Sequence, residues 1–395
     1  MRESCFKKAY CRYLICIISF IQISFAQDSI TKNYFEPSLN SYFGSVIKAY
    51  PDVPPSRFAS INSVAFTWKA AGKDLWQQRY RFPKFGVELF YSWFDNKENL
   101  GYNIGLVPIF EIKSKNPNKH FRLKFGMGAS YFNKPFDPVS NSNNFYIGGH
   151  YTNMSIASIF WTKTLSSKLK LTYGFASIHC SNGHTTLPNA GMNILTGHVG
   201  LRFESAHEHL RLPIKDDKKK LSYAVKLGLG MHMFGSTTKA VGGPRYPSYH
   251  VSCWTSIPRK QIHLWQLGFT VAYYTSFYDY IKSQEVYKSD QRLKACTGVI
   301  FGGHEFVFGK FSFSTQAGIY VYNPFFIKQK KIEQSWCNFS NKLEAISTNR
   351  LGLLYYPLKK ANKLNKVNNQ LMMGIFIKAN LAQADLFEYS VGYVF

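Results

Sequence analysis

The sequence predicts an all-β protein: a transmembrane antiparallel β-barrel of about 16 strands, within a range of about 12 to 16. Three observations favour this fold class. Apolar and polar residues alternate with a period of two in many segments of roughly ten residues. Aromatic residues make up 17% of the chain, and its last residue is Phe395. Together these features are typical of strands with lipid on one face and a polar lumen on the other.

Composition excludes several other classes. The chain has 395 residues, of which 45% are apolar, and its mean hydropathy is -0.20. These values exclude a disordered tail, a collagen-like chain and a coiled coil. No segment approaches the roughly 20 uninterrupted apolar residues that a spanning helix needs, so a polytopic helical membrane protein is also excluded.

The N-terminal segment indicates export. Its first dozen residues include four basic side chains, and an apolar run then extends to Phe25. Small residues around Ala26 suit a signal peptidase. We expect residues 1–26 to be a cleaved signal peptide and residues 27–395 to form a single outer-membrane β-barrel. The predicted location is therefore the outer membrane of a Gram-negative bacterium.

The strands follow from the alternation along the rest of the chain. Between 121 and 131, odd-numbered residues are mostly apolar and even-numbered ones small or charged, and 222–233 and 387–395 repeat this division. A soluble β-sandwich or lipocalin-like barrel would instead turn its apolar face inward. With these three, the predicted strands in chain order are near 42–50, 61–71, 84–94, 102–112, 121–131, 152–163, 169–181, 193–203, 222–233, 249–256, 262–276, 296–308, 311–322, 343–356, 370–381 and 387–395.

The cysteines indicate neither a disulfide scaffold nor a metal site. After the signal peptide the chain keeps Cys180, Cys253, Cys296 and Cys337, at scattered spacings and without a CxxC pair. The chain also has no glycine-rich phosphate loop. We therefore expect no metal, no cofactor and no nucleic-acid partner.

One hairpin carries polar residues on its oily face. On its first strand His179 and Ser181 share the parity of the apolar residues, so both point toward lipid, and on the returning strand Asn193 does the same. Thr196, His198 and Arg202 have lumen parity. Because unpaired polar groups in hydrocarbon cost several kcal/mol each, His179, Ser181 and Asn193 should be paired with each other.

These residues carry a family resemblance. His-x-Ser-Asn, a loop containing Pro-Asn-x-Gly, and a polar residue twelve positions after the serine resemble the lipid A 3-O-deacylase and acyloxyacyl hydrolase family of outer-membrane β-barrels. The resemblance covers residues 40–203, and residues 204–395 would supply additional strands. It implies an esterase that removes an ester-linked acyl chain from lipid A or lipopolysaccharide.

The resemblance assigns a role to each residue of the hairpin. Ser181 would be the nucleophile and His179 the general base, with Asn182 and Gly183 positioning the substrate or its oxyanion. The sequence departs from the family pattern at Asn193, where a glutamate is expected. An amide oxygen can fix the imidazole tautomer but cannot stabilise imidazolium by charge. Glu204 lies too far along the strand to replace it.

The expected partners are lipid A or lipopolysaccharide and outer-membrane lipid, and the oligomeric state is left open. The formal charge of +26 fits anionic phosphates but also a biased composition. The alternative hypothesis is a non-enzymatic porin, transporter or structural barrel with a relic hydrolase hairpin, because about 16 strands would enclose an aqueous channel. The enzyme hypothesis requires His179 and Ser181 to face outward, within hydrogen-bond reach of each other.

Overall fold

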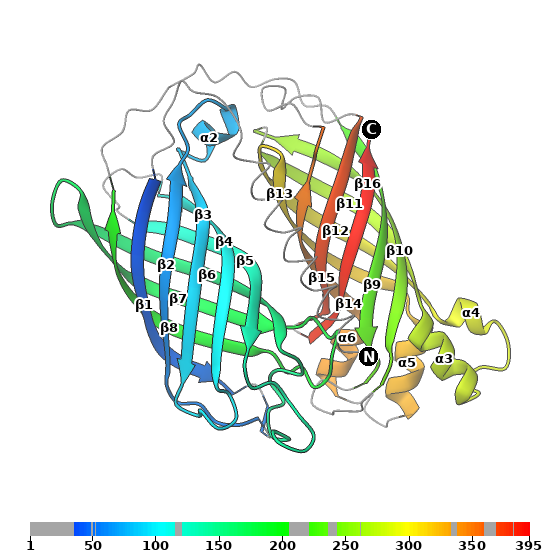
Figure 1. The fold of residues 1–395 in the computed structure, drawn as a ribbon. Coiled ribbons are helices and arrows are strands. Elements are labelled where there is room, and N and C mark those ends of the chain that lie inside the picture. Colours follow the sequence, from blue (N-terminus) through cyan, green and yellow to red (C-terminus); the bar gives the residue numbers. More distant parts are fainter. Residues whose placement is uncertain are drawn as a thin grey trace, which may run out of the picture. The chain divides into compact units, whose positions relative to one another are not determined.

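A computed structural model describes residues 35–48, 50–51, 53–114, 121–204, 221–235, 243–260, 262–332, 338–358, 369–381 and 383–395. The expected signal peptide, residues 1–26, lies outside the described residues. Residues Phe35–Phe395 belong to one compact unit. The described part contains 16 antiparallel strands, as the alternation predicts (Figure 1).

The first eight strands close into a barrel. Each strand pairs with the next along the chain, and β8 pairs back with β1, with Ser38 opposite Arg202 and Ile47 opposite Asn193. The strands are β1 (Phe35–Ile47), β2 (Ala59–Lys69), β3 (Lys84–Phe94), β4 (Tyr102–Lys113), β5 (Phe121–Phe132), β6 (Tyr151–Thr164), β7 (Leu169–Ser181) and β8 (Met192–Phe203).

The remaining eight strands close into a second barrel. Here β16 pairs back with β9, with Phe387 opposite Met231 and Val394 opposite Ala224. The strands are β9 (Ser222–Met233), β10 (Arg245–Arg259), β11 (His263–Tyr274), β12 (Cys296–Phe308), β13 (Phe311–Tyr322), β14 (Ser347–Tyr355), β15 (Gln370–Asn380) and β16 (Gln383–Val394).

The expectation of a single barrel was therefore wrong, although the strand count was right. The sheet closes after eight strands and then closes again. Alternation cannot distinguish one barrel of 16 strands from two barrels of eight, because in either case every strand separates an outer face from a lumen. Closure depends on which strand pairs with the first one to complete the ring, and that pairing joins residues far apart in the chain.

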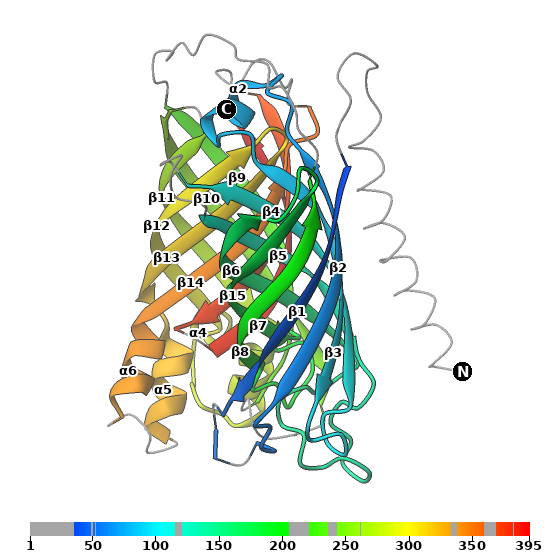
Figure 2. The same ribbon diagram turned by 90° about the vertical axis from the view of Figure 1, so that its left-hand side faces the viewer.

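Short helices occupy the connections between strands. Helix α2 (Leu75–Arg79) follows β2; α3 (Thr275–Ser283) and α4 (Gln291–Lys294) follow β11; α5 (Pro324–Ile332) and α6 (Phe339–Ile346) follow β13. The helices after β11 and β13 lie at one end of the second barrel (Figures 1 and 2). No helix in the described part of the chain has the length and apolar character needed to cross a membrane.

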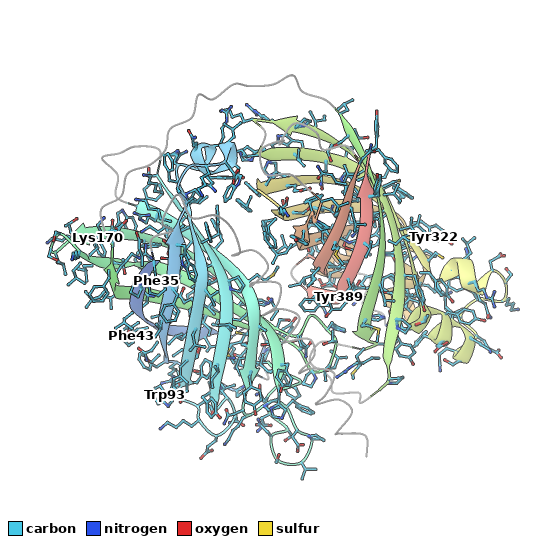
Figure 3. All side chains as sticks on the ribbon, turned by 45° about the horizontal axis from the view of Figure 1, so that its top comes forward. Phe35, Phe43, Trp93, Lys170, Tyr322 and Tyr389 are labelled. Carbon is cyan, nitrogen blue, oxygen red and sulfur yellow. The ribbon has the colours of Figure 1, made fainter. Side chains whose placement is uncertain are left out.

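The outer faces are apolar, and the lumens hold buried polar and charged residues together with apolar clusters. On β9, Leu227 is 62% exposed whereas its neighbour Lys226 is 1% exposed. Figure 3 shows Phe35 and Phe43 on β1 and Tyr389 on β16, all three about half exposed on the outside of their strands. The two faces thus have the polarity that the sequence pattern predicts.

Paired charges fill part of the lumen of the first barrel, and a cluster of buried apolar side chains fills another part. The Glu88 carboxylate accepts hydrogen bonds from Tyr42 (2.8 Å) and Ser63 (2.5 Å) and forms an ion pair with Lys124 (2.7 Å). Arg202 binds both oxygens of Glu111 in a fork. An eight-stranded barrel is just wide enough for its side chains to fill it, and these side chains do so.

The lumen of the second barrel has the same character. Glu388 forms ion pairs with Lys226 and Arg350. Glu305 accepts hydrogen bonds from Gln266 (2.9 Å) and Tyr356 (2.8 Å). The wide lumen on which the porin hypothesis relied is therefore not formed by the described strands.

The fork between Arg202 and Glu111 predicts a large stability effect. Arg202→Met leaves the Glu111 carboxylate buried without its partner, so we expect the free energy of unfolding to fall by about 3–5 kcal/mol. Urea unfolding in detergent, followed by gel mobility of the folded barrel, measures this loss. The double variant Arg202→Met/Glu111→Leu removes both charges and should recover much of the stability. A double variant as unstable as the single one would contradict the explanation.

Candidate functional site

The candidate site lies where β7 ends and β8 begins. In the register of this hairpin His179 lies opposite Asn193, and both belong to the outer face. Phe175, an outward residue earlier on β7, is 65% exposed, whereas Ile178 and Cys180 are buried in the lumen. His179 and Asn193 therefore face outward, as the alternation predicts.

His179 and Asn193 form the expected polar pair. The distance from His179 Nδ1 to Asn193 Oδ1 is 2.8 Å. An amide oxygen can only accept, so Nδ1 carries the proton and donates it. In the resulting tautomer Nε2 has a free lone pair and can accept a proton from a nucleophile.

Ser181 is held by a residue that the sequence reasoning did not single out. The Asn189 side chain lies at the Ser181 hydroxyl, with Nδ2 at 2.9 Å and Oδ1 at 3.3 Å from Oγ. The backbone N–H of Gly183 also donates to Oγ, at 3.1 Å. Asn189 belongs to the Pro-Asn-x-Gly segment of the loop, so its place in the motif was the available signal. Two donors thus converge on the serine oxygen.

Asn182 stabilises the loop that follows the serine. Its backbone N–H donates to Asn189 Oδ1 (3.1 Å), and its side-chain Nδ2 donates to the carbonyl oxygen of Thr186 (2.7 Å). The Thr185 hydroxyl donates to the Asn182 carbonyl oxygen (2.9 Å). The amide group expected to position an oxyanion is therefore engaged within the loop, and the donors that contact Ser181 come from Gly183 and Asn189.

The expectation that Ser181 would pair with His179 and Asn193 was wrong, because the loop brings Asn189 and Gly183 to the Ser181 hydroxyl instead. His179 and Ser181 nevertheless flank one small space. Gly191 has a φ of +72°, and a Cβ added to it would lie 3.1 Å from His179 Cε1 and 3.7 Å from Ser181 Cβ. Only glycine leaves this space open, and its positive φ is one that other residues adopt at a cost. Catalytic hydrogen bonds are often long before substrate binds, so this geometry is compatible with a serine that rotates toward the imidazole.

Other polar residues near the hairpin lie outside the candidate site. His198 faces the lumen, where its Nε2 lies 3.3 Å from Asn40 Oδ1. Glu204 forms ion pairs with Lys84 (2.9 Å) and Arg122 (3.5 Å) and does not join the site. Within the described residues no group of three or more His, Cys, Asp or Glu side chains could hold a metal ion.

His184 lies in the loop after the serine and is buried. Burial lowers the pKa of its imidazole, and the nearby Asp385 carboxylate and Gly235 carbonyl oppose that shift only in part. Burial therefore favours the neutral form of His184.

A groove of about 620 Å³ lies on the outer wall of the first barrel. Its walls are mostly apolar, and it borders β8, the strand that also carries Asn193. Residues of the outer face that line it are Leu39, Val64, Leu89, Tyr91, Val199 and Leu201.

The fold and the hairpin define a class: an eight-stranded barrel with a histidine, a serine and an asparagine at one end of its outer face. Residues 62–202 match the family model described as lipid A 3-O-deacylase (PagL), and residues 221–337 match the model described as acyloxyacyl hydrolase, C-terminal domain. The two models together span well over half of the chain. The chain therefore belongs to the lipid A deacylase and acyloxyacyl hydrolase family, a family of ester hydrolases.

Solved structures similar to this chain include the outer membrane enzyme PagL, with 12% identity, coverage of 42% of this chain and 99% of that one, and a TM-score of 0.29. The outer membrane protein OpdK from Pseudomonas aeruginosa has 9% identity, covers 91% and 98% of the two chains, and has a TM-score of 0.21. No curated protein matches the chain at a significant level.

The space at Gly191 gives a direct test of the site. Gly191→Ala places a methyl group between His179 and Ser181 at a strained φ, so we expect ester hydrolysis to fall by about 100-fold or more. Gly197→Ala is the matched control on β8, because the nearest atom to its added Cβ is 3.8 Å away. Acyl release by the two folded variants is compared in detergent. Equal activity of the two variants would show that the space is not used.

Proposed function

We propose that this protein hydrolyses an ester-linked acyl chain of lipid A or lipopolysaccharide, at the lipid-facing rim of its first barrel. The observation that carries the proposal is the hydrogen bond between His179 and Asn193 on the outer face, beside Ser181. Family membership supports the reaction class. The protein would act in the outer membrane of a Gram-negative bacterium, without a cofactor.

The reaction begins when the Ser181 hydroxyl turns from Asn189 to His179. Nε2 of His179 takes the proton while Ser181 Oγ attacks the carbonyl carbon of the ester. The carbon–oxygen bond to the sugar then breaks, and the imidazolium returns the proton to the leaving alcohol. Water enters, loses a proton to the same imidazole and releases the fatty acid from Ser181.

The oxyanion is stabilised by donors that already lie at the serine. Asn189 Nδ2 and the Gly183 N–H both contact Oγ in the resting site. When Oγ turns away to attack, these N–H groups become available to the carbonyl oxygen beside it. Donors fixed in advance stabilise charge without reorganisation, and this is often the largest contribution to catalysis.

Asn193 sets the histidine tautomer without adding charge. Its amide oxygen accepts from Nδ1, as the carboxylate of a Ser-His-Asp triad does, but gives less stabilisation to the imidazolium. We propose that it orients His179 and that hydrolysis is slower than a carboxylate at this position would allow.

Acyl chains would bind against the apolar outer wall. The groove is lined by Val199 and Leu201, which follow Asn193 on the outer face of β8. Burial of hydrocarbon contributes about 0.8 kcal/mol per CH₂ group. The lumens, filled by paired side chains in the described strands, give no support to a porin function.

Mass spectrometry of lipid A incubated with the purified barrel tests the reaction. The wild-type protein should remove one acyl mass, whereas Ser181→Ala and His179→Ala should remove none, because each lacks a reacting group. Asn193→Ala should retain partial activity, since it loses only the orientation of His179. Each variant must remain folded, as judged by gel mobility with and without heating. A folded Ser181→Ala barrel with full activity would refute the assignment.

Asn189 provides a second test, directed at the oxyanion. Asn189→Ala removes a donor and should lower kcat by about 100- to 1000-fold with a smaller effect on KM. Asn189→Asp keeps the shape but replaces the donor with an acceptor, so its kcat should fall at least as far. Wild-type kcat in Asn189→Asp would rule out a donor role.

A further inference from the structure

The loop that follows the catalytic serine is held by the second barrel. Residues Gly183, His184, Thr185 and Thr186 are consecutive, and each contacts a residue of β9, β10 or β16. Both barrels lie within the compact unit Phe35–Phe395. The contacts therefore connect the candidate site to the second barrel, to which the proposed mechanism assigns no role.

Two of these contacts fix the start of the loop. The Phe387 ring of β16 packs directly on Gly183, so closely that a Cβ on Gly183 would overlap it. The backbone N–H of Met233, the last residue of β9, donates to the carbonyl oxygen of His184 at 2.9 Å. Gly183 is also the residue whose N–H contacts Ser181 Oγ, so the ring packs against an oxyanion donor.

Arg245, the first residue of β10, holds the next two residues. Its Nε donates to the carbonyl oxygen of Thr185 at 3.0 Å, and its Nη2 donates to the hydroxyl oxygen of Thr186 at 2.9 Å. A guanidinium has a rigid fork of donors, so two such bonds fix a direction as well as a distance. The side chain orders the loop without touching Ser181.

The order passes from Thr186 back to the serine through hydrogen bonds within the loop. The Thr186 carbonyl oxygen accepts from Asn182 Nδ2 at 2.7 Å, and the Asn182 N–H donates to Asn189 Oδ1 at 3.1 Å. The Asn189 amide group is thereby turned so that Nδ2 lies 2.9 Å from Ser181 Oγ. Arg245 is thus linked to the oxyanion donor by a short chain of hydrogen bonds.

We propose that the second barrel positions the esterase loop, with Arg245 as its principal positioning residue; this inference rests on the proposed function. A loop of small and polar residues has many conformations, and only a narrow range keeps both donors aimed at the reacting carbonyl. Contacts from a closed barrel restrict that range before substrate arrives. The second barrel then serves catalysis through its outer wall.

Arg245→Ala is the test, and Arg259→Ala is its matched control, because Arg259 ends the same strand β10 at its opposite end. We expect Arg245→Ala to lower kcat by roughly 10- to 100-fold with little change in KM, since it misplaces donors and leaves the acyl groove intact. Arg245→Lys keeps a donor but loses the fork and should recover part of kcat. Arg259→Ala should match the wild type.

A second measurement separates this inference from the proposed function. Hydrogen exchange followed by mass spectrometry reports the protection of the peptide containing residues 182–191. Arg245→Ala should accelerate exchange there, and Arg259→Ala should not. An active wild type with unchanged kcat in Arg245→Ala overturns the positioning role. A wild type that releases no acyl chain overturns the proposed function, and unchanged exchange in Arg245→Ala then overturns the docking of the loop as well.

Discussion

The whole structure depends on the need to satisfy every backbone hydrogen bond inside the sheet. A strand edge in hydrocarbon leaves N–H and C=O groups without water, and closure into a barrel removes that edge. This chain closes twice, through the pairings of β8 with β1 and of β16 with β9. Because each ring has only eight strands, side chains fill its interior, and paired charges are among them. The proposed lipid substrate is therefore left with the outer face, where the candidate site lies.

The same rule explains how polar side chains can lie on an oily face. An imidazole and an amide placed there singly would each be costly. His179 and Asn193 satisfy each other across the hairpin, and Ser181 is satisfied by Asn189 and Gly183. The hydrogen bonds that make these polar groups tolerable also select the tautomer of His179 and bring donors to the serine. Stability and chemistry thus have the same local cause.

The sequence predicted what depends on neighbours along a strand. The outward parity of His179 and the position of Asn193 opposite it follow from a period of two and a hairpin. Closure into two rings was missed because it depends on pairing between distant strands such as β1 and β8. The contact of Asn189 with Ser181 was missed because it depends on the path of a loop, which no alternation describes. Spatial contacts of this kind become visible only once the fold is known.

In the proposed mechanism, the neutral partner of His179 changes where the stabilisation of the transition state must come from. A carboxylate at Asn193 would stabilise the imidazolium but would itself require burial beside lipid, and an amide avoids that cost. With less charge behind the histidine, a larger share of the barrier must be lowered at the oxyanion, by Asn189 and Gly183. Those two donors belong to the loop on which Phe387 and Arg245 act. On the proposed mechanism, a chain whose triad lacks a carboxylate therefore gains more from a second barrel that holds its loop in place.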